Sequence, residues 1–135
     1  MSTGIDPRAI VDPSDDEARA DMLLGAHLAG AAIEQSMLGA AHACANPLTA
    51  RFDLVHGRAV AMMLPHVVRF NGDLVGDQYR ELAGFTDQTT AVKAALRLAD
   101  RIEELRAGAA LPASLTEIGV SQAEIPELAA AASRE

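Results

Sequence analysis

The chain has 135 residues, of which 50% are hydrophobic and only 3% aromatic, and its formal net charge at pH 7 is −8. This length suits one domain with a buried core, and small aliphatic side chains favour closely packed helices over a β-sandwich. The negative charge disfavours binding to nucleic-acid phosphates, and the single cysteine, Cys44, excludes a disulfide framework.

The cellular setting is predicted from the same features. A lone cysteine fits a reducing compartment, and the polar, acidic N-terminal residues lack the pattern of a signal peptide. The apolar runs are far shorter than the ~18 residues of a membrane-spanning helix. We therefore expect a soluble cytoplasmic protein, with neither nucleic acid nor a membrane among its partners.

The first helix is predicted after a short arm. Residues 1–13 carry turn-forming residues and little periodicity, which predicts a lead-in arm before a helical domain over residues 14–135. Ser14-Asp15-Asp16-Glu17 has the spacing of an N-terminal capping box, and a helix is predicted over residues 15–43. Small residues follow one another at helical spacing, where another backbone can approach closely: Gly25, Ala29, Ala32, Ser36 and Gly39.

The middle of the chain contains two prolines in apolar surroundings. Residues 46–56 begin with Asn-Pro and are expected to form a loop. A second helix is predicted from about Gly57, with a kink or a break at Pro65, because proline cannot donate a backbone hydrogen bond. Asn-Gly-Asp at 71–73 predicts a turn, after which a short helix runs through Leu82.

The last part of the chain has the clearest helical pattern. Apolar residues recur at spacings of three and four over residues 89–106, and Gly108 stands where a helix stop is expected. Two more capping-box spacings are Ser114 with Glu117 and Ser121 with Glu124, the second opening a short alanine-rich helix. No segment alternates with period two for long, so the predicted fold class is all-α, with about six helices.

The residues that could carry chemistry have no diagnostic spacing on their own. The four histidines are His27, His42, His56 and His66. They form no H-x-x-x-H pair, and the sequence has no HExxH, CxxC, P-loop or GxGxxG motif. From spacing alone, each histidine is interpreted as a structural residue and Cys44 as a small buried hydrophobic residue.

A longer stretch changes that interpretation, because residues 29–72 combine several short motifs in a fixed order. These residues resemble the C-terminal signature of the iron-containing alcohol dehydrogenase family. The matching elements are Ala29-Gly30, Gly39-Ala40-Ala41-His42, Pro47-Leu48, His56-Gly57, Leu64-Pro65-His66-Val67 and Asn71. With its flanks, the similarity covers most of this chain but only the later part of a family enzyme. It implies a compact helical array like the C-terminal domain of these enzymes.

The resemblance also implies a metal site. Family members hold one divalent metal, Fe(II) or Zn(II), with an Asp and three His, and two of these His match His42 and His56. Mixed carboxylate and imidazole ligands with an open position suit both metals. The implied activity is NAD(P)-linked oxidoreduction between an alcohol and its aldehyde or ketone, with the metal acting as a Lewis acid on the alcohol oxygen.

The sequence departs from the family pattern at three points. The upstream G-x-D-x-x-x-H motif that supplies the other two ligands is matched only by Gly4-Ile5-Asp6, and Ile10 stands where its His is expected, so Asp6 is not assigned as a ligand. Asn46, which cannot titrate, stands where many members have a further His. The sequence contains no Gly-rich dinucleotide loop, so NAD or NADP is implied only if a partner domain supplies one.

Two hypotheses follow for the function. In the first, the chain is part of such an enzyme, either a truncated member or a subunit whose partner nucleotide-binding chain completes a site for a small alcohol or aldehyde. In the second, it is a non-catalytic helical interaction module that retains the scaffold. An exposed apolar or small-residue face is also expected on the helix over residues 15–43, and it predicts self-association into a homo-oligomer.

One geometric prediction tests the inherited site. His42 is expected near the end of one helix and His56 at the start of the next, across 13 intervening residues. If that connection folds back, the two imidazoles lie close enough to share one metal. His27 and His66 are expected to lie apart from this pair.

Overall fold

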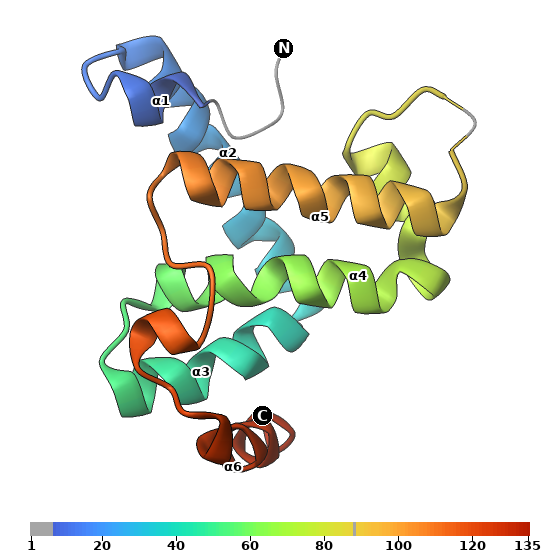
Figure 1. The fold of residues 1–135 in the computed structure, drawn as a ribbon. Coiled ribbons are helices and arrows are strands. Elements are labelled where there is room, and N and C mark those ends of the chain that lie inside the picture. The colour runs from blue at the N-terminus through green and yellow to red at the C-terminus, as the bar shows by residue number, and fades with distance from the viewer. Residues whose placement is uncertain (1–6, 88) are drawn as a thin grey trace. The chain divides into compact units, whose positions relative to one another are not determined.

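The computed structural model describes residues 7–87 and 89–135 (Figure 1). The helices in chain order are α1 (Arg8–Val11), α2 (Asp16–Ser36), α3 (Ala40–Phe52), α4 (His56–Leu82), α5 (Ala91–Gly108), the two 3₁₀ turns Thr116–Ile118 and Gln122–Glu124, and α6 (Ile125–Ala132). These described residues contain no strand, which confirms the predicted all-α fold class. Within them, no helix is both long enough and apolar enough to cross a membrane.

The chain divides into two compact units, one ending at Leu38 and the other running from Gly39 to Glu135. The first unit holds α1 and α2, and α1 lies inside the segment for which an arm was predicted. The assignment of residues 1–13 to an arm and 14–135 to one domain stays a prediction.

The start of α2 differs from the predicted capping box. Asp15, in extended conformation, is the N-cap, and its carboxylate accepts a hydrogen bond from the Ala18 amide at 3.0 Å. Ser14 instead donates its hydroxyl to Asp12 at 2.6 Å. The predicted Ser14–Glu17 box is therefore wrong by one residue, because aspartate caps a helix as well as serine does and Ser14 is already engaged.

The end of α2 is also earlier than predicted. The helix stops at Ser36, and Met37 takes a φ of 69°, which a continuing helix does not allow. The backbone is extended again at Gly39, from which α3 begins. Residues 15–43 therefore form one helix and the start of another.

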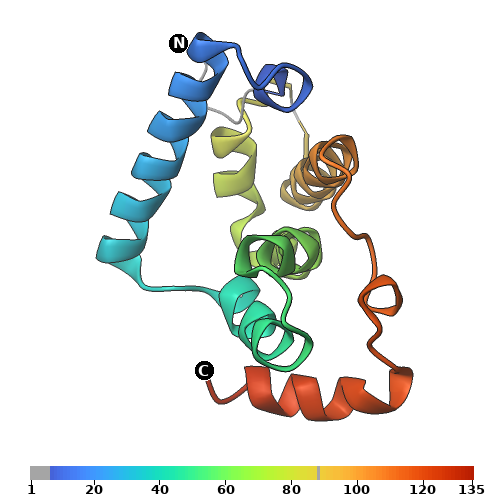
Figure 2. The same cartoon turned by 90° about the vertical axis from the view of Figure 1, so that its left-hand side faces the viewer.

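The second unit is built on α4 and α5, which lie side by side and run in opposite directions (Figures 1 and 2). Small residues allow the closest contacts along their seam. A Cβ at Gly72 would lie 2.7 Å from the Cβ of Ala95, and a Cβ at Gly76 would overlap the backbone carbonyl of Ala91. The two backbones therefore approach so closely that only glycine fits at position 76 without a shift.

The predicted loop over residues 46–56 is wrong over most of its length. Residues 40–52 form α3, which continues through Pro47, and only residues 53–55 connect it to α4. Proline inside a helix costs about 3 kcal/mol or more. Pro47 and Leu48 are both buried, and this burial in the core offsets the cost of the missing backbone hydrogen bond.

The predicted kink in the next helix is displaced. α4 continues through Pro65, whose side chain is less than 2% exposed, and through the expected turn at 71–73. The one residue with non-helical angles inside α4 is Val75, at φ −125° and ψ 17°. This kink lies directly before Gly76, where α4 meets the first residue of α5.

Two apolar clusters form the core of the second unit. One joins α3, α4, α6 and the 3₁₀ segment, with Ala45, Leu48, Ala59, Met62, Val120 and Leu128 buried in it. The other lies between α4 and α5 around Val68, Ala95 and Ala99. The first cluster holds α3 against the start of α4, and this positions the candidate site.

The C-terminal capping predictions hold. The Ser121 and Glu124 side chains form the predicted reciprocal box before α6. Ser114 and Glu117 also hydrogen bond to each other, at 3.2 Å between the side chains. Gly108 is the last residue of α5 rather than the residue after it, a difference of one position at a helix end.

Candidate metal centre

The two histidines singled out by the sequence lie at the start of two packed helices. His42 is the third residue of α3, and His56 is the first residue of α4. Their ring centroids are 5.3 Å apart, with an angle of 37° between the ring planes. The predicted proximity of the two rings is therefore confirmed.

The route by which the chain brings them together differs from the prediction. His42 lies at the start of a helix, not at its end, and most of the 13 intervening residues are helical. A three-residue connection reverses the chain, with Asp53 in the left-handed region at φ 49°. Since α3 and α4 then pack together in the same apolar cluster, their facing side chains are held by two helices rather than by a flexible loop.

A third polar group, Thr49, belongs to this site and was missed from the sequence. Its hydroxyl oxygen lies 3.4 Å from Nδ1 of His56. Positions 42, 46 and 49 are spaced by four and three, so they share one face of a helix. That signal was present in the sequence, but it had no meaning while residues 46–56 were expected to form a loop.

The third member of that face, Asn46, has a partner at the other end of the chain. Its amide nitrogen donates to the Glu135 carboxylate at 3.0 Å. The position at which the family resemblance implies a further histidine is therefore occupied here by an amide that is hydrogen bonded to a carboxylate.

The site is open to solvent. His42 is half-buried and His56 is exposed, so a ligand can reach both rings. His66, ten residues along α4 from His56, is exposed and lies beside Ser114 and Leu115 at a shallow groove. His27 is an exposed residue of α2 in the first unit.

The imidazoles of His42 and His56 could supply two of the ligands of a metal site. Imidazole nitrogens bind Fe(II) and Zn(II), and a His56 ring that donates Nδ1–H to Thr49 keeps the lone pair of Nε2 free for a metal. Among residues 7–87 and 89–135, no group of three His, Cys, Asp or Glu side chains is close enough together to hold a metal. Asp6, which the sequence analysis did not assign as a ligand, lies outside the described residues.

The comparisons with known proteins agree with the family that the sequence resembles. Residues 5–135 match the profile described as "Fe-containing alcohol dehydrogenase family, C-terminal". The lactaldehyde reductase of Escherichia coli strain K12 is 35% identical over 122 residues, which cover 87% of this chain and 32% of that protein. The 1,3-propanediol dehydrogenase of Citrobacter freundii is 33% identical over 126 residues, which cover 90% of this chain and 33% of that protein.

Solved structures extend the agreement to the fold. A 1,3-propanediol oxidoreductase superimposes with a TM-score of 0.87 at 28% identity, covering 96% of this chain and 35% of that one. An alcohol dehydrogenase from Oenococcus oeni gives a TM-score of 0.89 at 26% identity.

These helices therefore have the fold of the C-terminal part of known alcohol dehydrogenase structures. The chain belongs to the Fe-containing alcohol dehydrogenase family. It spans about a third of the length of the curated relatives that it matches.

Proposed function

We propose that His42 and His56 are two protein ligands of a divalent metal, Fe(II) or Zn(II), in an NAD(P)-linked alcohol dehydrogenase. The observation that carries this proposal is the 5.3 Å separation of the two rings, which come from different helices held in one core. Packing of α3 against α4 fixes this separation before any metal arrives, so little ordering is needed for binding. A bound metal supplies Lewis-acid polarisation of the substrate oxygen.

The chain's own residues orient the ligands. The Thr49 hydroxyl can accept from or donate to Nδ1 of His56, and as an acceptor it selects the tautomer whose Nε2 lone pair would be available to a metal. His42 is half-buried, whereas His56 is exposed. Asn46 cannot carry a proton, so we infer that it positions neighbouring groups and does not relay the alcohol proton.

The rest of the active site is proposed to lie outside these 135 residues. We infer that the remaining metal ligands and the NAD or NADP site belong to a nucleotide-binding domain, in the same polypeptide or in a partner chain. Two imidazoles alone leave a metal under-coordinated, and affinity for it is correspondingly low. The proposed substrates are small alcohols or aldehydes, the class named in the two curated relatives described above.

Metal titration of the 135-residue chain tests the ligand assignment. We expect one weak Zn²⁺ site by isothermal titration calorimetry, and a loss of ~10-fold or more in affinity for either His42→Ala or His56→Ala, because each removes one of two ligands. His66→Ala is the matched control, since it removes an exposed histidine of the same helix as His56. Equal affinity in all four proteins would overturn the assignment.

Activity measurements test the inferred division of the active site. We expect the 135-residue chain alone to give no turnover of 1,3-propanediol with NAD or NADP, because it supplies no nucleotide site. Turnover above that of a His42→Ala, His56→Ala double variant would contradict this. Activity that appears only on mixing with a nucleotide-binding chain would support the two-chain form of the proposal.

A second candidate function is a non-catalytic interaction module, and the exposed apolar side chains of α2 favour it. The fractional exposures of Leu23, Leu24 and Leu28 are 72%, 51% and 53%. A neighbouring gene that encodes a lone nucleotide-binding domain would favour the enzyme, and its absence together with an absence of metal binding would favour the module.

A further inference from the structure

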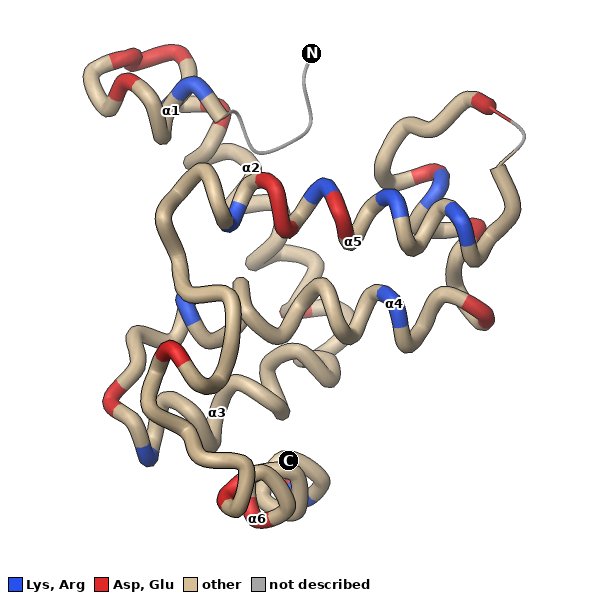
Figure 3. The backbone as a smooth tube through the Cα atoms, viewed as in Figure 1, with Lys and Arg blue, Asp and Glu red and all other residues tan. Residues whose placement is uncertain are grey.

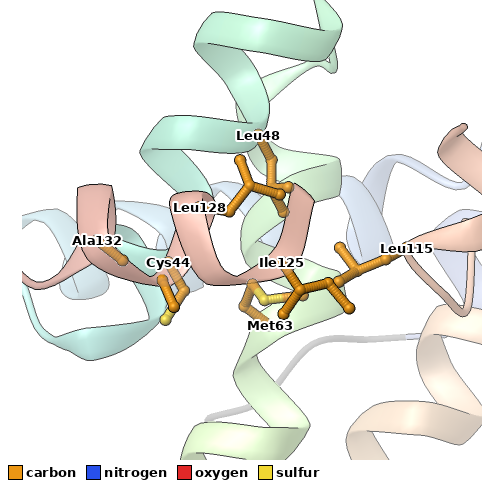
Figure 4. A pocket seen from close by; sticks show the side chains of 8 residues that line it. Cys44, Leu48, Met63, Leu115, Ile125, Leu128 and Ala132 are labelled. Carbon is orange, nitrogen blue, oxygen red and sulfur yellow. The ribbon is translucent and has the colours of Figure 1, made fainter. Parts of the chain in front are cut away.

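A small apolar cavity lies between α3, α4 and α6, within the second unit (Figure 4). Its volume is about 150 Å³ and it is open on one side. The lining residues carry no charge and are Cys44, Leu48, Met63, Leu115, Ile125, Leu128, Ala129 and Ala132.

The sequence of α6 explains why a space remains here. Ile125, Leu128, Ala129 and Ala132 follow one another at spacings of three, one and three, so they form one stripe that faces α3. The stripe is bulky at the start of α6 and consists of alanine near its end. Figure 4 shows the small side chain of Ala132 beside that of Cys44.

The cavity is separate from the histidine pair. Cys44 follows His42 by two residues, which is about 200° around a helix of 3.6 residues per turn. Cys44 and Leu48, four residues apart, therefore point to α6, while His42 points to His56. A molecule in the cavity would touch neither ring, so its binding does not depend on the proposed metal site.

We propose that this cavity binds a small uncharged apolar molecule. The lining offers almost no hydrogen-bond partners to water, so an uncharged apolar molecule of about benzene size displaces only poorly bonded water when it enters. A charged molecule would lose its hydration in contact with eight apolar or weakly polar side chains and gain no ion pair. The open side lets such a ligand exchange without unfolding α6.

The thiol of Cys44 provides a direct test on the whole 135-residue chain. Toluene is the probe, and N-methylpyridinium, which has nearly the same shape but a positive charge, is its matched control. The rate of Cys44 alkylation by iodoacetamide is measured by mass spectrometry. At a toluene concentration twice its Kd, mass action slows the reaction ~3-fold, whereas N-methylpyridinium leaves the rate unchanged.

Two variants separate cavity binding from general solvent effects. Ala132→Leu places a larger side chain in the cavity and is expected to remove the protection by toluene. Ala130→Leu, on an exposed position of α6 outside the lining, is expected to keep it. In amide NMR spectra, toluene should shift resonances of the non-proline residues within 44–48 and 125–132 in the Ala130→Leu variant and not in the Ala132→Leu variant.

Three results would overturn the proposal. Absence of protection by toluene in the wild-type chain together with unchanged amide resonances would overturn the proposal. So would equal protection by N-methylpyridinium, or protection by toluene that persists in Ala132→Leu.

Discussion

Both α2 and the α4–α5 pair carry small residues at helical spacing, but the two regions use them differently. Beyond their own chain neighbours and helix backbone, Gly25 and Gly30 of α2 have no atom within 4 Å of the place where a Cβ would stand. Gly76 of α4 faces the backbone of Ala91 so closely that a Cβ cannot fit. The same spacing therefore accompanies close packing of two helices within the second unit, whereas within the first unit the two glycines contact no neighbouring element.

The two regions also differ in the interactions that stabilise them. Ala18 is the only buried residue of α2, whose start is fixed by the Asp15 cap. The α4–α5 pair buries an apolar seam and adds charge pairs across it, since Arg69 contacts Glu103 at 2.7 Å and Asp100 at 2.8 Å. Figure 3 shows basic and acidic residues distributed along α5. The contribution of a small residue to stability therefore depends on where it lies in the fold, not on the composition of its helix.

The largest effect is expected from adding one methyl group to the seam. Gly76→Ala should destabilise the fold by roughly 2–3 kcal/mol, because the new Cβ forces the α4 and α5 backbones apart. The free energy of unfolding is measured by chemical denaturation followed by circular dichroism. Gly25→Ala in α2 is the control and should be neutral or stabilising by up to about 1 kcal/mol. Equal destabilisation by both changes would contradict the comparison.

A smaller, pH-dependent effect is expected from the charge pairs across the seam. Replacing Arg69 with Met should cost about 1 kcal/mol at pH 7, since Arg69 and both its carboxylates are partly exposed. The Arg69 guanidinium, by hydrogen bonding, lowers the pKa of Glu103 below its ordinary value of 4.5. The stabilisation is therefore present above pH 4.5 and is lost as the pH falls through the lowered pKa.

The measurement is the difference in unfolding free energy between the wild-type chain and Arg69→Met, followed from pH 7 to acid. This difference should shrink below pH 4.5 as Glu103 becomes protonated. Arg101→Met is the control, because Arg101 pairs with Glu104 within α5 and does not bridge two helices. A difference that stays constant with pH would rule out the ion pair as its cause.

The smallest effect on stability is expected on α2. Leu24→Ser combined with Leu28→Ser should change the free energy of unfolding by less than ~0.5 kcal/mol per site, because both side chains are more than half exposed. The same pair should reduce self-association of the chain in sedimentation velocity, since exposed leucines on one helix face favour contact between copies. A wild-type chain that sediments as a clean monomer at high concentration, without binding an apolar dye, would contradict this expectation.

The candidate site shows which features local sequence patterns predict and which they do not. The proximity of His42 and His56 was predictable because linked motifs at compatible spacing indicate a shared architecture. The role of Thr49 could not be predicted, because it depends on residues 46–52 being helical. Pro47 argued against that helix from local rules, and burial of Pro47 and Leu48 against distant parts of the chain outweighed them.

By itself, the sequence determined the helical fold class, the α6 capping box, the family and the two histidines that meet. These depend on periodicity, on side chains within three or four residues of one another, and on ordered motifs. Only the tertiary structure decided that helices continue through Pro47 and Pro65, that the kink falls at Val75, and that Gly76 admits no side chain. Each of these is set by atoms that are distant in the chain and close in space, and no local pattern encodes which atoms those are.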